Sequence, residues 1–268
     1  MRLRQPRPTL VTIIADLHIN STVGLVHPDY TGPENRTATQ RWIWSAWGAF
    51  WDRRRAQIKE HKAKHVLIIN GDTVEGRHHG IKEIVTPDEE MQLEMAIKIL
   101  DPVVKTADLL FIVRGTTVHD GSWCEVIGKD FGAQQTPEGK HCWWLLRAEW
   151  SGVQFNIAHH RRQSTLPWTA GGPENRLHAE VRYKYATEPD GVPDVVIRSH
   201  GHKSGCSMKT EPLVVFTPAW KAAGEYVRNR IDPDALADVG GVWFLLKDGR
   251  YTWDLDNVTE VRQPLWKE

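Results

Sequence analysis

The sequence predicts a single α/β domain built on two β-sheets. Three observations support this prediction. Short, β-branched apolar runs recur along the chain, and each ends in polar or glycine residues. Helical patterns separate the first three runs, which is typical of βαβ units and a largely buried sheet. After about residue 143 the connections shorten, which predicts hairpins and a second sheet.

Each predicted element rests on a local pattern. Helices are expected from Thr39 to about Lys64 and from Asp88 to about Lys105, where Thr86-Pro87-Asp88 is a typical helix start. The segments Asn20 to Asn35 and Gly121 to Gly139 are rich in Gly, Pro and polar residues, so they are expected to be loops. The predicted strands are Leu10–Ala15, Val66–Asn70, Leu109–Val113, Trp144–Trp150, Val153–Ala158, Val195–Ile197, Val214–Phe216, Gly241–Leu246 and Arg250–Leu255.

Composition excludes several classes of protein. The 268 residues carry 34 Lys and Arg against 34 Asp and Glu, a formal net charge of zero. This balance lacks the basic footprint of proteins that grip duplex nucleic acid through its phosphates, although it is compatible with a local basic groove. Cys124, Cys142 and Cys206 form no C-x-x-C pair, so neither a disulfide framework nor a cysteine zinc site is expected.

No repeat or shift in composition marks a domain boundary, so residues 1–268 are expected to form one domain. The apolar run at residues 10–15 is too short for a secretion signal. No run approaches the roughly 18 apolar residues that span a bilayer. We therefore expect a cytoplasmic protein with no membrane partner.

Residues able to bind metal follow the predicted strands. In open α/β sheets, ligands bind outside the carboxyl ends of the strands, so these side chains are expected to meet at one edge. Carboxylate and imidazole are ligands for Mn, Fe and Zn, and a pair of such ions needs a bridging carboxylate. The residues are Asp16, His18, Asp72, His119, Asp120, His159, His160, His200 and His202. They predict a dinuclear metal site.

Single members of this set are weak signals. An Asp-x-His after a strand is common by chance, and Gly-Asp is usually a turn. His200 and His202 are a stronger signal because positions i and i+2 of an extended segment point the same way, although two solvated loop histidines would give the same pattern. The order of the signals, each after an apolar strand, favours a common site.

The ordered motifs resemble the calcineurin-like metallophosphoesterases. The resemblance rests on Asp16-Leu17-His18, Gly71-Asp72, Gly115 to Asp120, a single His after a strand, and His200-Gly201-His202, and it covers about Thr9 to Lys203. It implies a four-layer αββα sandwich, in which two mixed β-sheets are flanked by helices, and a dinuclear centre that hydrolyses phosphate esters. By position, the resemblance assigns Asp16, His18 and His202 to one ion, Asp72 to the bridge, and His159 with His200 to the other ion. The cofactor is expected to be two divalent ions, manganese first, with iron, zinc or nickel as alternatives.

The third motif departs from the family pattern. Gly115-Thr116-Thr117-Val118-His119-Asp120 lacks the asparagine ligand of the Gly-Asn-His-Asp/Glu pattern and carries two extra residues. Thr116 or Thr117 is expected to offer a hydroxyl or backbone carbonyl oxygen to the second ion, which weakens that site, or the ion recruits water. A second choice lies between His159 and His160, and the position of His159 fits the family better.

The chemistry follows from such a site. Two cations neutralise a phosphate ester and lower the pKa of a shared water, so that hydroxide forms at neutral pH. His119, when protonated, is expected to donate to the leaving oxygen. Asp120 is expected to orient the His119 ring.

Other residues are candidates for substrate contact. His160, Arg161 and Arg162 follow a proposed ligand and could bind a phosphate or remain surface charge. His78 is either a specificity contact or solvated, and Asn20 is either a substrate contact or a turn cap.

An aromatic face precedes three arginines in the first predicted helix. Trp44, Trp47 and Trp51 share one helix face before residues 53–55. Packing on the sheet is the favoured interpretation, and a base-stacking platform is the alternative.

The leading hypothesis is a phosphodiesterase or nuclease whose partner is a phosphate ester such as DNA or RNA. A phosphomonoesterase is the alternative, which net neutrality favours. A non-catalytic scaffold with the same fold is a third reading.

Overall fold

The computed structural model describes residues 7–77, 82–161, 169, 171–230 and 232–259. Its strands are β1 (Thr9–Ile14), β2 (Lys64–Asn70), β3 (Leu109–Val113), β4 (Cys142–Trp143), β5 (Leu146–Trp150), β6 (Val153–Ile157), β7 (Val195–Arg198), β8 (Gly205–Cys206), β9 (Leu213–Phe216), β10 (Asp238–Lys247) and β11 (Arg250–Thr259). Its helices are α1 (Pro28–Asn35), α2 (Ala38–His61), α3 (Glu89–Val104), α4 (Trp123–Asp130), α5 (Gly172–Tyr185) and α6 (Glu225–Arg230).

The strands form two mixed sheets. The six-stranded sheet has the order β11-β10-β1-β2-β3-β4, and the five-stranded sheet has the order β5-β6-β7-β9-β8. β1 to β4 run parallel, while β10 pairs antiparallel with both β1 and β11. In the second sheet β6, β7 and β9 are parallel, and β5 and β8 are antiparallel edge strands. The expectation of an α/β fold with two mixed sheets is confirmed.

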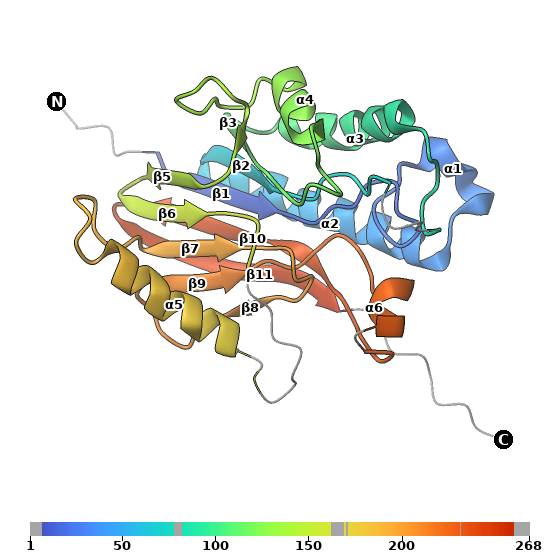
Figure 1. Cartoon of the computed structure of the whole chain (residues 1–268). Coiled ribbons are helices and arrows are strands. Elements are labelled where there is room, and N and C mark those ends of the chain that lie inside the picture. Colours follow the sequence, from blue (N-terminus) through green and yellow to red (C-terminus); the bar gives the residue numbers. More distant parts are fainter. Residues whose placement is uncertain (1–6, 78–81, 162–168, 170, 231, 260–268) are drawn as a thin grey trace.

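Alternation of side chains along the strands divides the molecule into layers. In β2, Leu67 and Ile69 pack with residues of α2 and α3, whereas Val66 and Ile68 pack with β6 and β7 of the other sheet. On the far side, Val196 of β7 packs with residues of α5. Helices thus cover the outer faces of two sheets that pack face to face (Figure 1), which is the four-layer αββα arrangement.

The tryptophan face of α2 is part of the core. Trp47 and Trp51 are 5% and 1% exposed, and Trp44 is partly buried against the same cluster. The Trp47 ring meets that of Trp220 edge to face at 4.8 Å between centroids. The packing interpretation is confirmed, and the base-stacking alternative for this face is wrong.

The arginines that follow this face are already paired. Arg53 and Arg54 both bind the Asp256 carboxylate, at 2.6 and 2.8 Å, and Arg55 pairs with Asp52 at 2.8 Å. The three arginines of α2 are therefore already engaged in ion pairs beside the buried aromatic face.

Two segments expected to be loops contain helices. α1 lies within residues 20–35, and α4 lies within residues 121–139. α4 buries Cys124 and Ile127 on one side, so a short amphipathic helix was masked by the glycines around it. In the part of the chain that the structure describes, no helix combines the length and apolarity needed to cross a membrane.

Candidate metal centre

Both sheets deliver acidic or histidine side chains just beyond the carboxyl ends of their parallel strands. Asp16 lies two residues beyond β1, and Asp72 lies two residues beyond β2. The Asp16 backbone N–H donates to the Gly71 oxygen at 3.0 Å, which joins the two loops. In the second sheet, His159 lies two residues beyond β6, and His200 lies two residues beyond β7.

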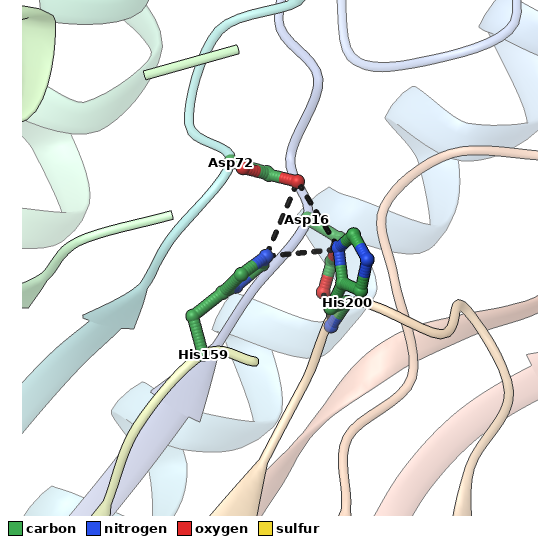
Figure 2. A group of neighbouring side chains, drawn as sticks. All are labelled: Asp16, Asp72, His159 and His200. Atoms are coloured by element: carbon green, nitrogen blue, oxygen red, sulfur yellow. Dashed lines mark hydrogen bonds and ion pairs between the residues drawn. The ribbon is translucent and has the colours of Figure 1, made fainter. Parts of the chain in front are cut away.

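These four side chains converge between the two sheets (Figure 2), and their ligand atoms lie within 4.8 Å of one another. His159 Nε2 is 3.2 Å from Asp72 Oδ2 and 3.9 Å from Asp16 Oδ1. His200 Nδ1 is 3.8 Å from Asp72 Oδ2, and its backbone N–H donates to Asp16 Oδ2 at 3.0 Å. Two carboxylates and two imidazoles thus surround one point.

A second set shares Asp16 and adds His18 and His202, again with ligand atoms within 4.8 Å. His202 Nε2 lies 3.3 Å from Asp16 Oδ1 and 3.0 Å from His18 Nε2. Asp72 forms a further set with His18 and His119 within the same limit. Asp16 and Asp72 therefore lie between two adjacent sites. The bridging role assigned to Asp72 stays a prediction.

The backbone is strained where these ligands sit. Non-glycine residues with φ between 43° and 87° are concentrated there, and such conformations are costly unless the surroundings enforce them. The strained residues of the site are Asp16, His18, Asn20, Asp72, His200 and His202. The loops after β1, β2 and β7 thus turn sharply and direct their ligands toward the centre.

Buried charge at the centre favours a cation. Burial raises the pKa of Asp16, but His159 and His202 outweigh it and hold the pKa below its usual range. For Asp72, His159 and His200 similarly overcome burial and hold the pKa well below its usual range. Burial lowers the pKa of His159, yet the carboxylates of Asp16 and Asp72 raise it to about 9. Both carboxylates therefore remain ionised and attract positive charge.

The donor set fits a pair of divalent ions. Asp16 Oδ1 and His159 Nε2 are buried, and they face other members of the ligand sets at 3.2 to 3.9 Å. Both atoms point at the shared centre. Carboxylate with neutral imidazole is the ligand chemistry of Mn, Fe and Zn.

Comparisons with known proteins concern the fold. No protein-family model matches the sequence, and no curated protein matches it. A novel archaeal phosphodiesterase shares 14% identity at a TM-score of 0.44, over 92% of this chain and 99% of the other. Vacuolar Protein Sorting 29 from Cryptosporidium parvum shares 13% identity at 0.41, over 96% and 100%. A predicted phosphoesterase from Streptococcus pneumoniae shares 10% identity at 0.35, over 95% and 98%.

The site residues follow the strands of the two sheets in the order that the sequence motifs predict. Asp-x-His, Gly-Asp, a single His and His-x-His follow β1, β2, β6 and β7, on two facing mixed sheets with helices outside. This arrangement matches the motif order on which the resemblance to the calcineurin-like metallophosphoesterases rests. The remaining site residues can be compared with the roles that this resemblance implies.

The two candidate histidines after β6 lie differently. His159 is buried, and its Nδ1 lies 2.7 Å from the Asn70 carbonyl oxygen. Because a carbonyl only accepts, Nδ1 carries the proton and Nε2 is left to face the carboxylates. His160 is exposed, with its ring centroid 5.2 Å from that of His159 and 5.5 Å from that of His200. This geometry favours His159 as the ligand and puts His160 on the solvent side.

A buried ion pair supports His18, and sequence reasoning missed it. Glu75 is fully buried, with Oε2 2.9 Å from His18 Nδ1. The same carboxylate accepts from Lys221 Nζ at 2.8 and 2.9 Å. Burial and the Lys221 charge lower the pKa of His18 to about 3, so its ring stays neutral and able to bind a cation. The only local signal was an acid three residues after Asp72.

The altered third motif meets Asp72 directly. Thr116 donates from its backbone N–H and its hydroxyl to Asp72 Oδ1, at 2.6 and 2.9 Å. Its carbonyl oxygen accepts from the backbone N–H groups of His119 and Asp120. Thr116 thus lies at the centre, but its polar groups act on Asp72 and on the turn. A role as a metal ligand stays a prediction.

The role expected of Asp120 is wrong. Its carboxylate accepts from the backbone N–H groups of Asp72, Thr73 and Gly115 at 2.8 to 3.1 Å. Burial, with the Asp72 charge, raises the pKa of Asp120 to about 7. Asp120 therefore fixes the loops after β2 and β3 rather than the His119 ring.

His119 is oriented by a different oxygen. Its Nδ1 lies 2.6 Å from the Glu75 carbonyl oxygen, and its ring packs edge to face on His18 at 4.4 Å. The ring belongs to the ligand set that it forms with His18 and Asp72, and its expected role as a leaving-group acid stays a prediction.

Arg161 lies against the His-x-His loop. Its guanidinium stacks on Phe216 at 4.2 Å from the ring centroid. A Cβ at Gly201 would lie 1.8 Å from Arg161 Nη2, so the guanidinium packs directly on the glycine between the two histidines. Arg161 is thus held beside the centre, where it can meet an anion.

Three other predicted contacts have different outcomes. Asn20 is fully buried, and its side chain exchanges two hydrogen bonds of 2.9 Å with the Thr86 backbone. It is a structural link between loops, so the substrate-contact interpretation is wrong. His78 and Arg162 lie outside the described residues.

Proposed function

We propose that this chain is a dinuclear metal-dependent phosphoesterase. The supporting observation is the pair of overlapping ligand sets around the buried Asp16 and Asp72, at the carboxyl ends of strands from two sheets. Two bound divalent cations, manganese first, would neutralise a phosphate ester and lower the pKa of a shared water. Iron, zinc and nickel are the alternatives.

The protein's own groups divide the remaining work. Because His119 Nδ1 faces a carbonyl oxygen, a protonated ring presents its Nε2–H to the leaving oxygen. His160 and Arg161 flank the ligands on the accessible side, and they would bind the oxygens of the substrate phosphate. Burial of the ligand carboxylates shields their charges from bulk water, which strengthens their attraction for cations.

The substrate we propose is a phosphodiester of a nucleotide or nucleic acid. His160 and Arg161 support an extended anionic substrate. The arginines of α2 do not, because they are already paired with carboxylates. Net neutrality supports the alternative, a phosphomonoesterase. A non-catalytic scaffold is the third candidate, and the departure in the third motif supports it.

Turnover of two nitrophenyl esters tests these candidates. We expect the manganese-loaded protein to hydrolyse bis(p-nitrophenyl) phosphate faster than p-nitrophenyl phosphate, and a chelator to abolish both reactions. Asp72→Asn should lower the rate by about a thousandfold, because metal ions supply several kcal/mol of charge stabilisation. The matched control is Asp101→Asn, which removes an exposed carboxylate of α3.

Each other result selects another candidate. Faster turnover of the monoester would make the protein a phosphomonoesterase. If the protein shows no turnover and takes up no metal, as measured by elemental analysis, the non-catalytic scaffold is the remaining candidate. Unchanged activity in Asp72→Asn would reject the proposed centre.

A further inference from the structure

One tryptophan is exposed at the edge of the metal centre. Trp144 is 69% exposed, and the next residue, Leu145, is 39% exposed. Both lie in the crossing from β4 of the first sheet to β5 of the second. By contrast, Trp47 and Trp51 of α2 are buried, as large aromatic side chains usually are.

Strand register places Trp144 beside the site. β3 and β4 are parallel, with Val113 opposite Trp143, so Arg114 and Trp144 follow at one level. β5 and β6 are antiparallel, with Leu146 opposite Ile157, and continuing that register by two residues brings Trp144 to the level of His159. Trp144 therefore lies at the carboxyl edge of both sheets.

The spacing from the ligands suits a substrate group. Asp72, Thr116 and Trp144 follow β2, β3 and β4, which are neighbours in the sheet. Two strand spacings, about 10 Å, therefore separate Asp72 from Trp144. A nucleoside attached to a phosphate at the metal centre can span such a gap.

A fixed cation supports the indole. The Arg114 guanidinium lies 5.0 Å from the centroid of the Trp144 ring. Its Nη1 donates to the Gly121 oxygen at 2.9 Å, and its backbone N–H donates to the Trp143 oxygen at 2.8 Å. With Arg114 against it and 69% of its surface exposed, the indole is held in place and still open to a ligand.

We propose that Trp144, backed by Arg114, stacks on the nucleobase of a nucleotide ester held at the metal centre. This inference rests on the proposed phosphoesterase function and names its substrate class. Stacking on an indole suits every base, because each base has a π-face, and the adjacent guanidinium adds attraction for the phosphodiester backbone. The indole thus contributes binding, not chemistry.

A matched pair of substrates isolates the base. Thymidine 5′-(p-nitrophenyl phosphate) and methyl p-nitrophenyl phosphate carry the same leaving group and differ in the nucleoside. Trp144→Ala should raise KM for the thymidine ester by roughly 5- to 100-fold with little change in kcat, as expected for loss of one stacked base. The methyl ester should be unaffected, and Trp144→Phe should retain most of the binding.

Tyr183→Ala is the control, because Tyr183 is an exposed aromatic on α5, in the outer layer behind the second sheet. Equal losses on both esters in Trp144→Ala, or none on either, would overturn the proposal. A binding assay separates it from the proposed function. Titration of thymidine monophosphate into the manganese-loaded protein needs no diester turnover, and Trp144→Ala should weaken that binding.

The same assay distinguishes the two sources of the base. If the natural substrate is a nucleic-acid strand, a fluorescent single-stranded oligonucleotide should bind more tightly than the mononucleotide and lose affinity in Trp144→Ala. If it is a free nucleotide, only the mononucleotide should respond. Failure of both to respond to Trp144→Ala overturns the stacking site even when the nitrophenyl esters are hydrolysed.

Discussion

Two buried histidines at opposite ends of the strands show what distinguishes the site from the core. His65 lies at the amino end of β2, with Nδ1 3.1 Å from the carbonyl and hydroxyl oxygens of Thr106 and Nε2 3.0 Å from the Thr12 hydroxyl. His159 lies beyond the carboxyl end of β6, with Nδ1 2.7 Å from the Asn70 oxygen. Its Nε2 faces the carboxylates of Asp72 and Asp16 at 3.2 and 3.9 Å.

Their protonation follows from their neighbours. Both residues are fully buried. Burial lowers the pKa of His65 to about 4, so it is a neutral, hydrogen-bonded core residue. Burial also disfavours the charged form of His159, but two carboxylates reverse the effect and raise the pKa to about 9. Burial alone therefore identifies neither a ligand nor a core histidine. The charges around the ring do.

Charged neighbours also control a histidine within the centre, where the buried ion pair of Glu75 and Lys221 contacts His18. We expect Glu75→Gln to weaken the ion bound by Asp16, His18 and His202 by about 10- to 100-fold, which is the usual effect of removing a carboxylate that orients a histidine ligand. Calorimetric titration of the chelated protein with manganese measures this. The substitution should also lower stability by about 3–5 kcal/mol, because Lys221 is left buried and uncompensated.

Lys221→Met is the matched control. It breaks the same ion pair but leaves the Glu75 carboxylate against His18. Stability should fall, whereas manganese affinity should be retained. If both variants lose affinity to the same degree, the ion pair contributes to folding and has no separate role in orienting His18.

The site could be predicted from the sequence because its residues belong to short local motifs that directly follow strands. Asp16, Asp72 and His159 each follow an apolar run, and parallel strands bring such positions together. Ion pairs between residues far apart in the sequence could not be predicted. Lys221 meets Glu75 across 146 positions, and Arg54 meets Asp256 across 202, so no local pattern encodes either pair.

Short-range errors had a different cause. The residues around α4 are rich in glycine, and its eight residues give too few turns for an apolar period to stand out. Asp120 and Asn20 are polar residues in loops, where a role in the site and a role in holding the loop together give the same sequence signal. Their burial and their hydrogen bonds to backbone groups show that both side chains hold neighbouring loops together.

A smaller effect is expected at the altered third motif. Thr116 places a hydroxyl 2.9 Å from Asp72 Oδ1, where the family pattern has an amide. Thr116→Asn should tighten binding of the second manganese equivalent by about tenfold, or about 1.4 kcal/mol, because an amide oxygen is the better ligand. Thr116→Ser keeps the hydroxyl and should match the wild type. Titration of the second equivalent measures both, and weaker binding in Thr116→Asn would show that the hydroxyl is the preferred group.

The smallest expected effect is on stability and concerns His65, which lies away from the centre. Its pKa is about 4 in the folded chain and near 6.5 when unfolded, so only the unfolded chain binds this proton in between. The stability contributed by the neutral ring is complete above pH 6.5 and is lost as the pH falls toward 4. Between pH 7.5 and 5.5 this amounts to about 1 kcal/mol. Urea unfolding of manganese-saturated protein should show that His65→Gln loses less stability than the wild type over this interval. Parallel pH curves would mean that His65 exchanges its proton as freely in the folded chain as in water, contrary to its place between Thr12 and Thr106.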